Sequence, residues 1–263
     1  MPSARINGID LFYEDTGGTG PTVIFSHGLL MDHEMFAPQV EVLRDKYRCI
    51  AWDERGHGRT ARDTLAPFTY YDSANDLAAL LNHLGIKQAV LAGMSQGGFL
   101  SMRCALTHPG IVRALVLIDT QAGLEDPAEM VNQQAMSKEW VENGLSSPLA
   151  DAIEHIILGD GWSGAAAWRA KWATWKPANL IGCLQTLVGR DDITDSVSRI
   201  KVPTLVIHGD ADAAIPMERA QVLVDRIPNS ELVVIPGGGH AANLTHPAPV
   251  NTAIKKFLER LPA

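Results

Sequence analysis

Short apolar runs alternate with amphipathic stretches along much of this chain. Leu77, Leu80, Leu81 and Leu84 recur at helical spacing, for example, and Gly85 follows as a stop signal. Because strands that are apolar on both sides and alternate with helices are typical of a covered parallel sheet, we expect an α/β fold. Asn7-Gly8 separates two short segments, 4–7 and 10–14, and predicts an antiparallel hairpin. The expected buried strands are 22–26, 47–52, 88–92, 112–118, 204–208 and 231–235, and the expected helices between them are 35–44, 71–84, 98–106, 217–226 and 247–261.

This rhythm stops between about residues 120 and 199, where short helical segments are broken by glycine and proline. We therefore predict a core domain of residues 1–120 and 200–263 and an inserted helical cap of residues 121–199. Trp168, Trp172 and Trp175 fall on one helical face of this insertion. Two interpretations stay open: the tryptophans attach the helical layer to the sheet, or they line an apolar substrate pocket. We include all three among the candidate substrate-binding residues.

The composition of the chain argues against some kinds of binding partner. The net charge is −8 and no basic cluster occurs, which argues against a nucleic-acid partner. No secretory signal and no apolar stretch of the roughly 18–20 residues that span a bilayer are visible, so we expect no membrane partner and a cytoplasmic location. The three cysteines are expected to be reduced, and the nine histidines show no metal-ligand spacing. We predict no metal and no cofactor, and the oligomeric state stays open.

Gly93-Met94-Ser95-Gln96-Gly97 lies between an expected strand and an expected helix. This arrangement is typical of a nucleophile elbow, a sharp turn in which flanking glycines give room and the serine backbone is strained. Such a turn presents a serine hydroxyl to a base and a substrate together. We take Ser95 as the candidate nucleophile and Met94 as a neighbouring substrate-binding residue.

A serine nucleophile needs a base and an acid that orients the base. His240 follows the last expected strand in a glycine-rich loop, at the edge of the sheet that also carries Ser95, and is the candidate base. Asp212 and Asp210 both follow the strand 204–208. We favour Asp212 over Asp210, with Asp119, at the end of the strand 112–118, as a more distant candidate.

The oxyanion hole is expected from two backbone N–H groups, those of Gln96 and Leu29. Gly28 would let the chain approach the substrate closely, so it is a further candidate binding residue. His27 is expected to brace this loop rather than to react. Asp53 and Arg55 are expected to form a local ion pair.

Taken in order, these pieces resemble the α/β-hydrolase superfamily over essentially the whole length. The resemblance lies in His27-Gly28, Asp53-x-Arg55-Gly56-x-Gly58, Gly93-x-Ser95-x-Gly97-Gly98, Gly209-Asp210-x-Asp212-x-x-x-Pro216 and Gly239-His240. Within the superfamily the chain is most similar to the 3-oxoadipate enol-lactonase-like group. The resemblance implies an eight-stranded, mostly parallel sheet with helices on both faces and an inserted cap.

The function expected from these residues is cofactor-independent hydrolysis of a carboxylic ester or lactone with an apolar or aromatic substrate. Three alternatives stay open: hydrolysis of a carbon–carbon bond in a dienoic diketone, perhydrolysis, and ligand binding without turnover on a hydrolase scaffold. Fold alone does not choose among them.

Overall fold

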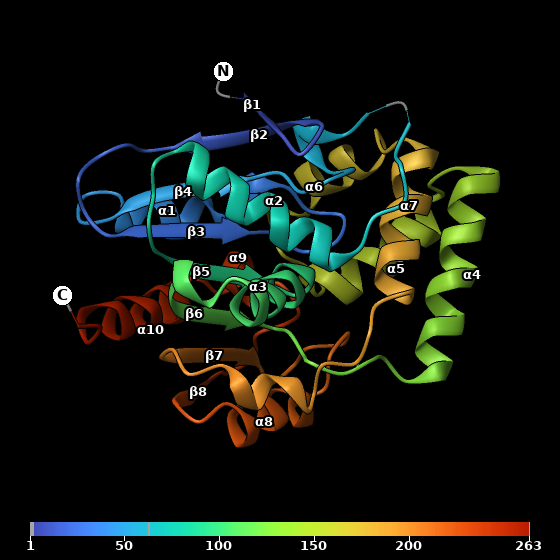
Figure 1. The fold of residues 1–263 in the computed structure, drawn as a ribbon. Helices are drawn as coiled ribbons and strands as arrows, with labels where there is room; N and C mark the ends of the chain where they lie inside the picture. The colour runs from blue at the N-terminus through green and yellow to red at the C-terminus, as the bar shows by residue number, and fades with distance from the viewer. Residues whose placement is uncertain (1–2, 63, 263) are drawn as a thin grey trace.

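A twisted sheet runs through the centre of the molecule (Figure 1). The structure is a computed structural model that describes residues 3–62 and 64–262. Within these ranges eight strands form one sheet in the order β1-β2-β4-β3-β5-β6-β7-β8. The strands are β1 Ser3–Ile6, β2 Ile9–Asp15, β3 Thr22–Ser26, β4 Arg48–Trp52, β5 Ala89–Met94, β6 Val112–Ile118, β7 Thr204–Gly209 and β8 Ser230–Ile235. The predicted fold class, a mostly parallel α/β sheet, is confirmed.

The antiparallel part is confined to one edge. β1 pairs with β2, and β2 pairs with β4, in antiparallel register, whereas the pairs from β4 to β8 are parallel. Ile6 lies opposite Ile9, so Asn7 and Gly8 form a two-residue turn, both with positive φ. This is the backbone that an Asn-Gly hairpin turn requires.

Helices cover both faces of the sheet because successive strand residues point to opposite sides. Val23 and Phe25 of β3 belong to one apolar cluster, and Ile24 belongs to the other. The first cluster packs on α1 and α10, and the second on α2, α3 and α8. The core helices are α1 Ala37–Leu43, α2 Tyr70–His83, α3 Gln96–Thr107, α8 Met217–Arg226, α9 Ala242–Thr245 and α10 Pro247–Glu259, with short 3-10 turns η1 His33–Phe36, η2 Gly58–Thr60, η3 Pro109–Ile111 and η4 Ser196–Arg199.

Two element bounds differ from the prediction in ways that concern the site. The strand expected to end at residue 92 continues to Met94, and the helix expected from residue 98 begins at Gln96. Strand and helix are therefore separated by Ser95 alone, which makes the turn sharper than glycine positions suggested.

Four further helices occupy the chain between β6 and β7. They are α4 Pro127–Asn143, α5 Ser147–Leu158, α6 Ala165–Trp172 and α7 Pro177–Val188. We call them the cap helices; Figure 1 shows them beside one end of the sheet, with α4 outermost. The division of the chain into core and cap at residues 121 and 199 stays a prediction, and its outer ends, residues 1 and 263, lie outside the described ranges.

None of the helices described here combines the length and the apolar composition that a bilayer-spanning helix needs.

Candidate active site

Ser95 occupies a strained turn between β5 and α3. Its φ is +51° and its ψ −116°, a backbone region that costs a non-glycine residue of order 1–3 kcal/mol. The turn is held by neighbours, since the Ser95 N–H donates to the Ile118 carbonyl at 2.9 Å and Thr120 Oγ1 donates to the Ser95 carbonyl at 2.7 Å. A Cβ at Gly93 would lie 2.1 Å from the Gly97 carbonyl oxygen, so no side chain fits there. The backbone itself therefore requires the glycine of the elbow.

The structure brings Ser95, His240 and Asp212 into one hydrogen-bonded row. His240 Nε2 lies 3.0 Å from Ser95 Oγ, and His240 Nδ1 lies 2.9 Å from Asp212 Oδ2. Asp212 is fixed in turn, because its Oδ1 accepts the backbone N–H groups of Ala214 at 2.8 Å and Ile215 at 3.0 Å. The three side chains come from three loops at the carboxyl edge of the parallel sheet.

Asp210, the alternative acid, points elsewhere. Its Oδ1 accepts the backbone N–H of Gly237 at 2.7 Å, which ties the loop after β7 to the loop after β8. Asp212 is thus the aspartate of the pair whose carboxylate reaches His240.

His240 and Asp212 stabilise each other's charged forms. Burial acts to lower the pKa of His240, but the charge and hydrogen bond of Asp212 outweigh it, and the pKa is raised above 6.5. Burial likewise acts to raise the pKa of Asp212, and His240 together with the backbone N–H donors holds it below its usual value. An imidazolium on His240 is therefore stabilised, which is what a base needs once it has taken a proton.

Asp119 lies directly behind this row. Its carboxylate is fully buried and accepts the N–H groups of Gly209 at 2.8 Å and Ala242 at 3.1 Å. Burial, followed by the charge of Asp212, raises the pKa of Asp119 well above its usual value. Burial and the neighbouring Asp212 charge thus disfavour the ionised form of Asp119, and its oxygens hold the loops that carry Asp212 and His240.

Ligand atoms of Asp119, His208 and Asp212 all lie within 4.8 Å of one another, which makes this group a candidate for metal binding. The geometry does not suit it. His208 Nε2 faces the Ile215 carbonyl at 2.8 Å, and Asp212 Oδ2 is bonded to His240. A cation there would have to displace the bond between Asp212 and His240.

The loop after β3 carries Leu29, one of the two residues expected at the oxyanion hole; the other, Gln96, follows the elbow. A Cβ at Gly28 would lie 2.5 Å from Met94 Sδ and 3.6 Å from Ser95 Cβ, so the loop passes directly over the elbow. Gln96 is the first residue of α3, and its backbone N–H therefore has no acceptor within the helix. Among the described residues the Leu29 N–H also has no hydrogen-bond acceptor. Within the part of the chain that the structure describes, both N–H groups thus lack a backbone acceptor, and Leu29 lines the same cavity as Ser95.

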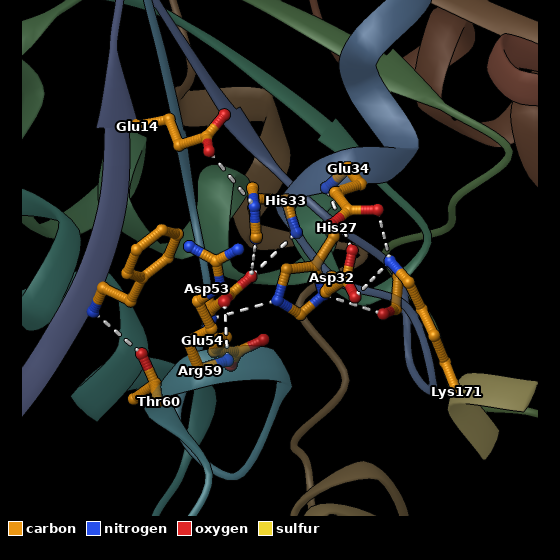
Figure 2. A network of polar contacts seen from close by, with 12 residues as sticks. Glu14, His27, Asp32, His33, Glu34, Asp53, Glu54, Arg59, Thr60 and Lys171 are labelled. Atoms are coloured by element: carbon orange, nitrogen blue, oxygen red, sulfur yellow. Dashed lines mark hydrogen bonds and ion pairs between the residues drawn. The ribbon is translucent and has the colours of Figure 1, made fainter. Parts of the chain in front are cut away.

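His27 braces this loop, as the sequence suggested. Its Nδ1 lies 2.8 Å from the Gly28 carbonyl, and its Nε2 accepts the backbone N–H of Glu54 at 3.0 Å (Figure 2). Burial lowers the pKa of His27, so the ring is neutral and fits the acceptor role.

The expected ion pair between Asp53 and Arg55 is wrong. Arg55 reaches α2 instead and pairs with the buried Asp76 at 2.5 Å. Asp53 is saturated by another set of donors: the N–H and Nδ1 of His33 at 2.7 and 2.8 Å and the N–H of Arg59 at 2.8 Å (Figure 2). Asp53 and Arg55 are only two residues apart, but their side chains point in different directions. Each therefore binds partners from other parts of the chain.

Helix α6 holds the loop after β3, which carries the predicted oxyanion-hole residue Leu29. Trp172 is fully buried, and its indole N–H donates to the Leu30 carbonyl at 3.0 Å. Lys171 Nζ donates to Asp32 Oδ2 at 2.7 Å and to Glu34 Oε2 at 2.8 Å (Figure 2). Leu30 itself has a φ of +63°, so the gripped segment is bent where Leu29 presents its N–H.

The three tryptophans proposed as pocket residues are therefore misplaced. The Trp172 ring is used in the grip on Leu30, Trp168 lies under the Lys171 ammonium at 4.2 Å from the ring centroid, and Trp175 packs edge-on against His57 at 5.0 Å. Trp168 and Trp172 lie on α6, but Trp175 lies three residues beyond its end, so the three do not share one helical face, and none of them lines the cavity at Ser95. These contacts favour the interpretation that the tryptophans attach the helical layer rather than line the substrate pocket.

A cavity of about 520 Å3 opens at Ser95 and His240. Its wall is mostly apolar and comes from the core loops and the cap helices. Met94 belongs to it as expected; sequence reasoning missed the cap residues, because helical periodicity marks an apolar face but not what the face meets. The lining residues include Leu29, Leu30, Met94, Phe99, Met136, Trp140, Ile153, Ile157, Leu180, Leu184, Leu187 and Ile215.

A buried carboxyl group supports the oxyanion-hole residue Gln96. Gln96 Nε2 donates to Glu54 Oε2 at 2.6 Å, and the Tyr70 hydroxyl lies 3.4 Å from Gln96 Oε1. Burial raises the pKa of Glu54 to about 8. Local spacing could not indicate this contact, because Glu54 and Gln96 meet only when the loop after β4 folds against the elbow.

Comparison with known proteins shows the family of the chain. The family profile described as the alpha/beta hydrolase fold matches residues 21–154, and a profile described as TAP-like protein matches residues 169–262. A Synechocystis relative, provisionally named a non-heme chloroperoxidase, is 32% identical over 95% of each chain. The 3-oxoadipate enol-lactonase 2 of Acinetobacter baylyi is 26% identical over 91% of this chain and 89% of its own.

Solved structures of hydrolases are also similar to this chain. A thermophilic esterase from Thermogutta terrifontis superposes with a TM-score of 0.89 at 29% identity and covers 100% of both chains. The enol-lactonase from Burkholderia xenovorans reaches 0.89 at 25% identity, covering 98% of this chain and 100% of its own. The resemblance to the enol-lactonase-like group is thus confirmed.

Proposed function

Because the chain belongs to the α/β hydrolase fold family, we propose that it is a serine hydrolase that cleaves carboxylic esters or lactones through an acyl-enzyme. The observation that carries the proposal is the row Ser95–His240–Asp212, with spacings of 3.0 and 2.9 Å, at the mouth of an apolar cavity. A hydrolase of this kind needs a nucleophile, a base and an oriented base partner in that order.

The first half of the reaction follows from the geometry. His240 Nε2 takes the proton of the Ser95 hydroxyl while Oγ attacks the substrate carbonyl carbon. Asp212 holds the ring so that Nε2 faces Ser95, and it stabilises the imidazolium. The free N–H groups of Gln96 and Leu29 receive the oxyanion of the tetrahedral intermediate. His240 then protonates the departing alkoxide, which leaves an acyl group on Ser95.

In the second half, water takes the place of the alcohol. His240 removes a proton from the water as the oxygen attacks the acyl carbonyl, and the acid is released as Ser95 recovers its proton. The strained elbow supports this cycle by fixing Oγ before substrate arrives, so little reorganisation is needed in either step.

A fluorophosphonate probe and an aryl ester test the proposal. We expect the probe to label Ser95, and Ser95→Ala to lose both labelling and hydrolysis of p-nitrophenyl hexanoate. Ser101→Ala is the matched control, because Ser101 lies one α3 turn and more from the elbow and its hydroxyl only donates to the Gly97 carbonyl at 2.6 Å. Ester hydrolysis that survives Ser95→Ala would overturn the proposal.

A second activity is favoured by the names of relatives. Alongside the Synechocystis protein, a bromoperoxidase from Bacillus anthracis matches with a TM-score of 0.83 at 26% identity. On the same row, hydrogen peroxide would replace water in the second half and release a peracid. Formation of peracetic acid from acetate ester and peroxide, abolished by Ser95→Ala, is the expected result; peroxide chemistry that persists in Ser95→Ala excludes this route.

A further inference from the structure

Apart from Ser95, His240 and Glu125, the polar residues of the cavity wall come from one helix. α4 lies outermost among the cap helices (Figure 1) and turns one stripe of side chains towards the cavity. The stripe changes along the helix, from a carboxylate and amides in its first turns to apolar groups at its far end. Its members, spaced by three or four residues, are Glu129, Asn132, Gln133, Met136, Ser137 and Trp140.

Away from His240, the charged side chains at this wall are negative. Among the described residues that line the cavity, Glu125 and Glu129 are acidic, and none is lysine or arginine. A negatively charged group at the distal end of a substrate would therefore meet carboxylates and find no cation in the wall.

One buried cation lies near the cavity, but its donors are used. Arg190 pairs with Glu125, with the two side chains 2% and 8% exposed. The guanidinium also donates to the carbonyls of Leu187 at 2.8 Å and Gly123 at 3.0 Å. The charges of Arg190 and Glu125 largely cancel in the cavity. The negative charge that acts on a substrate therefore comes from Glu129.

Arg190 is also shielded from a bound substrate. Its guanidinium lies 4.5 Å from the centroid of the Phe99 ring, and Phe99 lines the cavity whereas Arg190 does not. Recruiting Arg190 to a substrate anion would leave Glu125 buried without its partner, which is strongly unfavourable.

The wall also offers a hydrogen-bond acceptor. Gln133 Oε1 is buried, and within residues 3–62 and 64–262 it has no hydrogen-bond partner. A buried acceptor without a donor costs free energy, and a turn of the Gln133 side chain towards the cavity would let a donor on a bound ligand recover it. Glu129 and Gln133 lie four residues apart on α4, on the same face.

We propose that this stripe of α4 makes the cavity selective for acyl groups that end in an uncharged or positively charged group, and against acyl groups that end in a carboxylate. The proposal rests on the proposed ester hydrolysis at Ser95 and names the substrate class that this site takes. Apolar walls hold the chain of the substrate, and Glu129 with Gln133 receives its distal end.

Three p-nitrophenyl esters of matched chain length test the selectivity. The hexanoate ends in a methyl group, the adipate half-ester ends in a carboxylate, and the 6-aminohexanoate ends in an ammonium group. One charge at several ångströms in a partly solvated site changes kcat/KM by about tenfold. We expect kcat/KM for the adipate half-ester to be about tenfold below that for the hexanoate, and the 6-aminohexanoate to equal or exceed the hexanoate.

Charge reversal on α4 tests the residue. Glu129→Lys is expected to raise kcat/KM for the adipate half-ester at least tenfold relative to the hexanoate. Glu139→Lys makes the same change of net charge on the same helix, outside the cavity lining, and is expected to leave the ratio within twofold. Because Glu129 is exposed at the cavity edge, 0.5 M NaCl should narrow the wild-type ratio by screening.

Equal kcat/KM for hexanoate and adipate half-ester in the wild type would overturn the selectivity, as would a ratio that Glu129→Lys and Glu139→Lys shift alike. Failure of the proposed function looks different: the hexanoate would not be hydrolysed and the fluorophosphonate probe would not label Ser95. The two failures are therefore separable.

Discussion

The hydrogen bond from Trp172 to the Leu30 carbonyl joins the cap to the oxyanion hole, and Trp172→Phe tests it. The substitution keeps an aromatic ring in a fully buried position but removes the indole N–H. The Leu30 carbonyl, next to the Leu29 N–H, then loses its donor. We expect the variant to lose both stability and turnover.

The stability loss can be worked from the contacts. A buried carbonyl left without a donor costs about 1–3 kcal/mol. The smaller ring leaves a void that costs roughly 1 kcal/mol more at about 24 cal/mol per Å3. The free energy of unfolding, measured by urea titration, should therefore fall by about 2–4 kcal/mol.

We expect turnover to fall because the Leu29 N–H is displaced, and not because any charge is removed. Removal of one oxyanion donor costs about 100- to 1000-fold in kcat. Displacement of Leu29 without its removal should cost a fraction of that on a logarithmic scale, about tenfold in kcat. KM for p-nitrophenyl hexanoate should change little, because the apolar cavity wall is retained.

Trp168→Phe is the matched control. Trp168 lies on the same helix and is also buried, and it contacts Lys171 through its ring face. It should lose stability from the void but keep kcat, since among the described residues its indole N–H holds no carbonyl of the loop. Equal kcat in the two variants, measured where both are folded, would refute the idea that Trp172 positions the oxyanion hole.

Three further predictions concern titratable groups. Asp212→Ala should lower kcat by at least 1000-fold, whereas Asp210→Ala should lower it less than tenfold; comparable losses in stopped-time aryl-ester assays would reassign the acid. Because Asp212 outweighs burial and raises the pKa of His240, kcat/KM should fall with decreasing pH with a midpoint above 6.5; a midpoint below 6 contradicts this. Burial raises the pKa of Glu54 from 4.5 to about 8, so the folded state holds a proton that the unfolded state has lost, and stability should fall as pH rises between these values. Glu54→Gln should flatten that slope in urea titrations at pH 5 and pH 8, and an unchanged slope would exclude Glu54 as its source.

The sequence alone predicted the parts of this molecule that depend on local signals. The strand before Ser95, the glycine at residue 93 and the loop position of His240 each follow from neighbouring residues and from the rule that carboxyl ends of parallel strands share an edge. Asp212 was favoured over Asp210 from the turn that follows it, and its carboxylate does reach His240.

Contacts between distant segments were beyond such reasoning. The spacing of Trp168, Trp172 and Trp175 predicted one helical face, but α6 ends at Trp172, and such a pattern does not say whether a side chain meets substrate or protein. Arg55 pairs with Asp76 rather than with Asp53 for a related reason. The partner is fixed by the packing of α2 against the sheet, which no local spacing encodes.

The attachment of α4 has a consequence for how selectivity changes in this molecule. Of its 17 residues only Trp140 is buried, and the stripe towards the cavity is otherwise half-buried or exposed. Replacements at such positions usually alter stability by less than about 0.5 kcal/mol. Ser95, His240 and Asp212 are held by the sheet and its loops, so residues 129, 132, 133 and 137 can be randomised together while the reacting groups stay in register. Substrate choice can thus drift, or be engineered, at almost no cost to the fold or to the chemistry.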